Sequence, residues 1–108
     1  MKKLEKMYQQ IANNEIEVIM ERTRKMLGMA PEEYTVAKMN DTLGKCVNGK
    51  ITINPELMQY KKEIIEYVVI HEFCHLKYKT HSKKFNELIE ENIKYYKKYE
   101  TISKQINF

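Results

Sequence analysis

Apolar side chains recur every three or four residues across residues 3–27, which is the spacing of one face of a helix. Gly28 follows directly and is a natural C-terminal stop. Asn13-Asn14 interrupts the pattern, and Asn14 with Glu17 three residues later would form a second helix start. The pattern therefore predicts an N-terminal helix that is either continuous with a weak middle or divided into two segments.

Shorter segments with strand character follow this helix. Residues 34–39 predict one strand, and residues 43–47 and 50–53 flank Asn48-Gly49. Asn-Gly is the pair that best tolerates the positive φ values of a two-residue type I′ turn. Pro55 has no amide hydrogen to donate and ends the pairing. We therefore expect three short strands, the last two forming an antiparallel hairpin, packed on helices.

Two further helical patterns complete the chain. The segment from about Lys61 to Tyr78 is apolar on two sides, so we expect it to be buried between the sheet and the other helices. Ser82 is a candidate N-cap for a last helix. The inward face of that helix would comprise Phe85, Leu88, Ile89, Ile93, Tyr96 and Tyr99. Helices that flank a small sheet predict the α+β class.

Length and composition agree with a globular protein. The 108 residues, 43% of them hydrophobic and 31% charged, are sufficient for a single domain spanning residues 1–108. No stretch reaches membrane-spanning length, and the basic start has no apolar segment behind it. We expect a cytoplasmic protein with no membrane partner. Cys46 and Cys74 are too few for a disulfide framework, and we interpret both as packing residues.

Positive charge is concentrated near the C-terminus. The chain carries a net charge of +4, and residues 77–98 contain seven Lys against three Glu, which is also +4. A solvated helix face is the ordinary interpretation of mixed Lys and Glu. The alternative is a surface for an acidic partner or nucleic acid, but aromatic residues are not interleaved with the basic ones as a stacking platform requires.

The chemically distinctive stretch is His71-Glu72-Phe73-Cys74-His75, with His81 six residues further on. On a helix, His71 and His75 lie one turn apart on the same face, and Glu72 projects beside them. A shuffled chain of this composition would contain such a motif roughly 0.007 times. Two imidazoles and a carboxylate would also be costly to bury without a metal or partners. The motif predicts half of a zinc site.

A zinc site of this kind requires a third protein ligand. His81 is our preferred candidate because it lies just past the predicted end of the helix, where a turn can bring its ring back. The rival is a carboxylate on the following helix, Glu87, Glu90 or Glu91.

The residue types also indicate a reaction. Zinc held by three protein ligands leaves one position for water and lowers the pKa of that water to about 7. Glu72 would accept the proton as the water attacks a carbonyl carbon, and would then donate it to the leaving nitrogen. The predicted function is zinc-dependent hydrolysis of peptide bonds in a peptide or protein substrate.

The same residues resemble a known family. His71-Glu72-Phe73-Cys74-His75-Leu76 and His81-Ser82-Lys83-Lys84-Phe85 are similar to the two motifs of the YgjP-like zinc metallopeptidases, which are related to the SprT-like and WLM groups. Upstream, Leu43-Gly44-Lys45-Cys46 and the following hairpin are similar to the family's strand and hairpin. The similarity covers about residues 11–99.

The resemblance implies a zincin-like α+β fold, with His71, His75 and His81 as zinc ligands and Glu72 as the catalytic acid/base. It also implies that strand 43–47 is a candidate edge for binding the substrate backbone. Two family tryptophans are absent here, with Leu43 and Asn86 in their places. These departures concern the walls that bind substrate and leave the expected metal ligands intact.

Two functions of other classes stay open at this point. One is a zinc-stabilised binding module that lacks efficient catalysis. The other is a nucleic-acid-associated protein, suggested by the basic C-terminal segment and by some SprT-like relatives that act on DNA-bound proteins.

Overall fold

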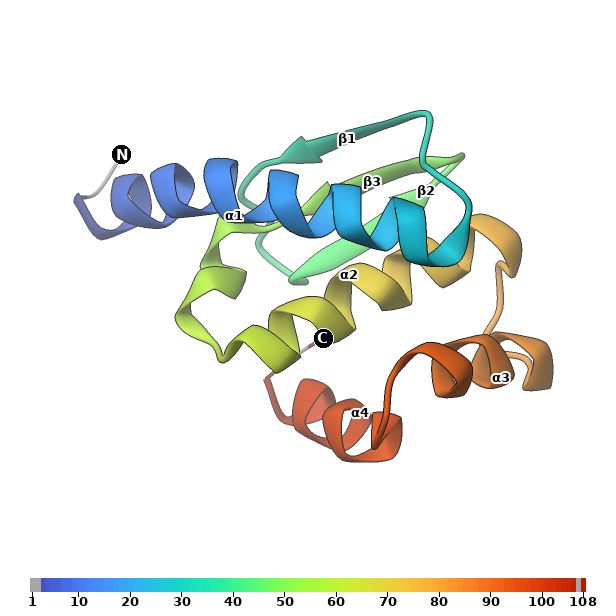
Figure 1. Ribbon diagram of the computed structural model, residues 1–108. Helices are drawn as coiled ribbons and strands as arrows, with labels where there is room; N and C mark the ends of the chain where they lie inside the picture. The colour runs from blue at the N-terminus through green and yellow to red at the C-terminus, as the bar shows by residue number, and fades with distance from the viewer. Residues whose placement is uncertain (1–2, 107) are drawn as a thin grey trace.

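The computed structural model describes residues 3–106 and residue 108. Its elements follow one another as α1 (Lys3–Leu27), β1 (Glu33–Val36), β2 (Gly44–Val47), β3 (Lys50–Ile53), the 3₁₀-helix η1 (Pro55–Gln59), α2 (Lys62–Lys77), α3 (Lys83–Asn92) and α4 (Tyr96–Gln105). The sheet lies on one side of α2, and α3 and α4 lie on the other (Figure 1). This is the predicted α+β architecture. Within the described residues, no helix has a segment long and apolar enough to cross a membrane.

The N-terminal helix is continuous, so the two-segment alternative is wrong. Asn13 and Asn14 lie on the exposed side of α1, where polar side chains do not disturb its packing. The buried face consists of Ala12, Ile16, Ile19, Met20 and Thr23. Gly28 ends the helix as predicted, with φ +68° and its amide donating to the carbonyl of Arg24 at 2.9 Å.

The strands of the described sheet are ordered β1-β3-β2. β2 and β3 form the predicted antiparallel hairpin around Asn48 (φ 51°) and Gly49 (φ 80°). β1 runs parallel to β3 and ends at Val36, before the expected residue 39. The reason is that Val36 pairs with Ile53, the last residue of β3, so the chain beyond this point has no partner strand.

A buried asparagine fixes the start of β2. Asn54 is 1% exposed, and its side-chain amide donates to the carbonyls of Met39 at 2.8 Å and Thr42 at 3.0 Å. Its side-chain oxygen accepts the amide of Glu56 and thereby caps η1. One side chain therefore ties the loop before β2 to the end of β3.

The central helix α2 agrees with the prediction to within one residue at each end. Its buried residues lie on several sides of the helix: Ile64, Ile65, Tyr67, Val68, Val69, Ile70, Glu72, Phe73 and Cys74. Because α2 packs against α1, the sheet, α3 and α4, little of its surface remains exposed.

The prediction of one continuous last helix is wrong. Ser82 does cap α3, accepting the amide of Phe85 at 3.3 Å, but that helix ends at Asn92. Tyr95 then adopts a left-handed conformation (φ 65°, ψ 34°) before α4 begins. After this bend, α4 packs against α2 and Ser103 is buried.

Candidate metal centre

Helix α2 presents two of the predicted site histidines on one face. His71 and His75 are one turn apart, and their ring centroids are 4.9 Å from each other. The helix positions them because the residues around them are buried against the sheet and α1, which leaves this face for the cleft.

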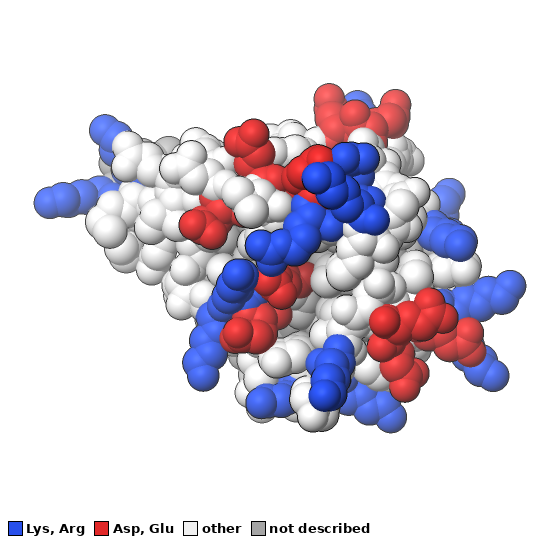
Figure 2. Space-filling model, viewed as in Figure 1, with Lys and Arg blue, Asp and Glu red and all other residues white. Residues whose placement is uncertain are grey.

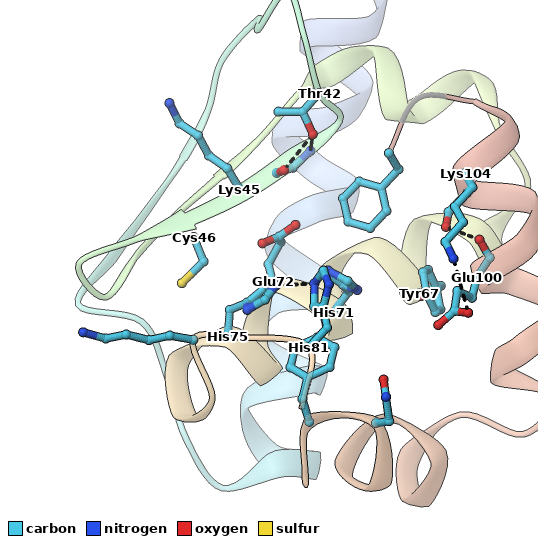
Figure 3. A pocket seen from close by; sticks show the side chains of 16 residues that line it. Thr42, Lys45, Cys46, Tyr67, His71, Glu72, His75, His81, Glu100 and Lys104 are labelled. Carbon is cyan, nitrogen blue, oxygen red and sulfur yellow. Dashed lines mark hydrogen bonds and ion pairs between the residues drawn. The ribbon is translucent and has the colours of Figure 1, made fainter. Parts of the chain in front are cut away.

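The turn after α2 brings in the third histidine. The α2 helix ends at Lys77, and the N-cap at Ser82 begins α3, so only a short connection separates the two helices. His81 lies in this connection, with its ring centroid 5.1 Å from that of His71 and 4.9 Å from that of His75. The structure thus gathers all three histidines of the chain, drawn together in Figure 3.

The histidine cluster, which we define as His71, His75 and His81, suits a metal ion. Each ring offers a ligand nitrogen, and these three atoms lie within 4.8 Å of one another. The Nε2 atoms of His75 and His81 are 3.1 Å apart. Zinc–nitrogen bonds of about 2.0–2.1 Å in a tetrahedral site separate two ligand nitrogens by roughly 3.3 Å. The observed separation is close to that value.

The protonation of His75 is set by its surroundings. Its Nδ1 is 3.1 Å from the carbonyl oxygen of Tyr78, which can only accept, so Nδ1–H is the donor. The lone pair is therefore on Nε2, the atom that faces His81. Burial lowers the pKa of this imidazole, which also favours the neutral form that a metal ligand requires.

His71 has a buried ring nitrogen without a hydrogen-bond partner. Among the described residues, its Nδ1 makes no hydrogen bond. Burial, with the neighbouring His75 and His81, lowers the pKa of His71 to about 3. A neutral imidazole with an unsatisfied polar atom is unfavourable in a closed interior. A cation bound at this nitrogen would satisfy it.

Glu72 lies between β2 and the histidine cluster (Figure 3). Its side chain is 3% exposed, and burial raises its pKa to about 8. The approach of β2 is close: a Cβ on Gly44 would lie 3.2 Å from one carboxylate oxygen of Glu72 and 3.0 Å from Val68. A glycine at this position leaves room for the carboxylate, and buried carboxyls with strongly shifted pKa values are typical of functional sites.

An aromatic side chain that we interpreted only as core packs against all three histidines. The ring centroid of Phe85 lies 5.1 Å from that of His71, 4.6 Å from that of His75 and 4.9 Å from that of His81. Phe85 is 1% exposed and lies four residues after His81, in the first turn of α3. Its place in the second motif was the signal that could have identified it.

The histidine cluster and Glu72 line a cleft of about 470 Å³. One wall is formed by Thr42, Gly44, Lys45 and Cys46 at and before β2. The opposite wall includes Glu100, Ser103, Lys104 and Phe108, from α4 and beyond, with Tyr67 from α2. The Phe108 ring is 4.8 Å from that of His71. The sequence left open whether residues 101–108 cover the cleft, because their position follows from the bend at Tyr95.

The rival third ligands are not brought to the cluster. Glu87, Glu90 and Glu91 do not line the cleft, and among the described residues the only group able to hold a metal ion is the histidine cluster. Both cysteines are free thiols. Cys74 is buried in the core, whereas Cys46 borders the cleft on β2.

The fold is the zincin-like fold of known metallopeptidases. The structure is similar to the metallopeptidase zymogen abylysin of Pyrococcus abyssi, with a TM-score of 0.69 and 24% identity over 81% of this chain and 90% of that one. It is also similar to the zymogen jannalysin of Methanocaldococcus jannaschii, with a TM-score of 0.70 and 17% identity over 86% and 97% of the two chains. At these identities the likeness establishes the fold.

The sequence identifies the family. The model of the YgjP-like metallopeptidase domain matches residues 1–106, and the chain belongs to that family. A search of curated proteins finds no match. The resemblance drawn from the two histidine motifs is therefore confirmed, and a metallopeptidase domain implies a metal ion.

Proposed function

We propose that this chain is a zinc-dependent peptidase in which His71, His75 and His81 hold the metal and Glu72 is the general acid/base. The observation that carries the proposal is the convergence of three neutral or exposed imidazoles beside one buried carboxylate in a single cleft. We further propose that residues 1–108 act as one metallopeptidase domain on peptide or protein substrates.

Several residues around the cleft have separate roles in the proposed reaction. Tyr78 holds His75 in the tautomer that presents Nε2, and Phe85 packs against the three imidazoles and restricts their rotation. When bound, zinc supplies a Lewis acid that polarises a carbonyl and makes water a nucleophile near neutral pH. A cation held by the three histidines would favour the ionised form of Glu72, which would then accept a proton from the attacking water and donate it to the leaving nitrogen. Gly44 packs against its carboxylate on the β2 side.

The test combines metal analysis with cleavage of a peptide library. We expect stoichiometric zinc in the wild type and in Glu72→Gln, with activity about 10²- to 10⁴-fold lower in the variant. Glu63→Gln, in the first turn of the same helix, is the matched control and should retain full activity. Absence of zinc from the wild type would refute the proposal.

The third ligand has its own variant. His81→Ala should lose zinc affinity and activity, because a two-histidine site lacks a ligand that structural and catalytic zinc sites both require. Full zinc stoichiometry with full activity in His81→Ala would remove this residue from the site.

Other outcomes correspond to the alternatives. Zinc in the wild type with no cleavage of any peptide would favour a zinc-stabilised binding module. A nucleic-acid-associated role stays a prediction, tested by salt-dependent DNA binding. Figure 2 shows Lys, Arg, Asp and Glu interspersed over the face in view, which is the distribution of an ordinary solvated surface.

A further inference from the structure

Strand β2 borders the cleft with its backbone edge. Gly44, Lys45 and Cys46 are consecutive, so their side chains alternate between the two faces of the sheet, yet all three line the cleft. This is possible when the edge of the strand itself faces the cavity. In the described sheet, β2 pairs only with β3, so its other edge is open to an additional strand.

The ladder determines which backbone groups lie on this open edge. The amide of Asn54 donates to the carbonyl of Leu43 at 2.9 Å, across the hairpin. Because bonding alternates along an antiparallel strand, the backbone groups of Lys45 also face β3, and those of Gly44 and Cys46 face the cleft. The backbone groups of Gly44 are already hydrogen-bonded to the Thr42 side chain. The Thr42 hydroxyl donates to the Gly44 carbonyl at 3.0 Å and accepts the Gly44 amide at 3.4 Å. Cys46 is left to present its N–H and C=O.

The two faces of β2 differ in character. Gly44 and Cys46 lie on the face toward α2, since a Cβ on Gly44 would touch Val68 and since Cys46 is two residues further along the same strand. Lys45 is on the opposite face, where it is exposed and pairs in register with Thr52. Within the described part of the chain, no carboxylate lies within ion-pair distance of Lys45.

A second lysine of the cleft also has no carboxylate partner among the described residues. Lys79, from the turn after α2, also lines the cleft, is exposed, and has no ion pair among the described residues. Across the cleft, Lys104 is paired with Glu100 at 3.7 Å. Figure 3 shows Lys45 on one side of the histidine cluster and Glu100 with Lys104 on the other. The cleft is therefore electrostatically asymmetric.

The family resemblance already implies that a substrate backbone pairs with the open edge of β2. We propose that a peptide running antiparallel to β2 on this edge carries an acidic side chain opposite Lys45. The inference rests on the proposed function, which makes a peptide the substrate. The strand register places the acidic side chain opposite Lys45. A peptide residue opposite Cys46 exchanges backbone hydrogen bonds with it, so the neighbour opposite Lys45 is in a non-hydrogen-bonded pair. Side chains in such pairs are the closest across a ladder. Lys79 adds to the attraction for acidic peptides without specifying a position.

The experiment measures peptide binding separately from cleavage. Zinc-loaded Glu72→Gln protein is titrated with fluorescent peptides in which one Glu is moved through successive positions of an otherwise uncharged sequence, each compared with its Gln counterpart. We expect one position at which Glu binds about twofold to fivefold tighter than Gln, with the difference lost at high salt. In the Lys45→Glu background, a peptide with Lys at that position should instead bind more tightly than its Gln counterpart, by a similar factor.

A control and a parallel assay separate the possible failures. Lys97→Glu makes the same change in net charge on α4 outside the cleft and should leave the positional preference unchanged. Equal binding of all Glu and Gln peptides, no binding at all, or an equal effect of Lys97→Glu would overturn the inference. Wild-type cleavage without any acidic preference would overturn it while sustaining the peptidase. If tighter binding of the Glu peptide depended on Lys45 but the wild type cleaved no peptide, the inference would stand and the proposed peptidase function would be refuted.

Discussion

Helices α2 and α4 both line the cleft, but they are held in place very differently. Most residues of α2 are buried, and this helix carries His71, Glu72 and His75. In α4 the only buried residue is Ser103, and the preceding Tyr95 supplies no side-chain cap. The candidate chemistry is thus on the most constrained helix, where packing fixes the side-chain geometry. The opposite wall is on a helix with fewer constraints, as is common for surfaces that contact a substrate.

The largest expected difference between these helices is in stability. Phe73, 0% exposed on α2, fills the core between α1 and the sheet. Phe73→Ala should lower the free energy of unfolding by about 3–5 kcal/mol, measured by urea denaturation, because it leaves a large cavity. Tyr99→Ala on α4 is the comparison, and it should cost clearly less since that ring is only partly buried. Equal losses would mean that α4 is as firmly packed as α2.

A smaller effect is expected where α2 meets β2. An added Cβ at Gly44 would lie 3.0 Å from Val68 and 3.2 Å from the Glu72 carboxylate. Gly44→Ala should therefore lower the free energy of unfolding by about 1–3 kcal/mol and reduce kcat, because the strand and the carboxylate must move apart. Lys45→Ala, whose side chain is on the other face of the strand, should leave the stability almost unchanged. A Gly44→Ala variant with wild-type kcat would show that Glu72 tolerates displacement.

The smallest effect, of opposite sign, is expected at the start of α4. Tyr95 has φ 65°, a conformation that costs energy for any residue with a Cβ. Tyr95→Gly should raise the free energy of unfolding by about 0.5–1 kcal/mol, detected as a higher Tm. Tyr95→Ala removes the same exposed ring but keeps the Cβ, so it should bring no such gain. If Tyr95→Gly and Tyr95→Ala both raised the Tm, the gain would come from removing the exposed tyrosine ring and not from the backbone conformation.

Sequence reasoning was accurate where local periodicity and turn chemistry decide the structure. It located α2 to within one residue at each end, the Asn48-Gly49 hairpin, the stop at Gly28 and the cap at Ser82. It failed for the C-terminal helix, because Ile93, Tyr96 and Tyr99 continue the helical spacing of α3 although the chain bends between them. Periodicity does not report such a bend, since the benefit comes from packing against α2.

The candidate site divides in the same way. The sequence by itself determined that His71 and His75 share one face of a helix beside Glu72, because the i, i+4 spacing is a property of the helix alone. Only the tertiary structure decided that His81 reaches the same point and that Phe85 packs against all three rings. It also decided that the open edge of β2 and the turned-back α4 form the two walls of the cleft. These features depend on contacts between residues distant in the chain, which no local pattern records.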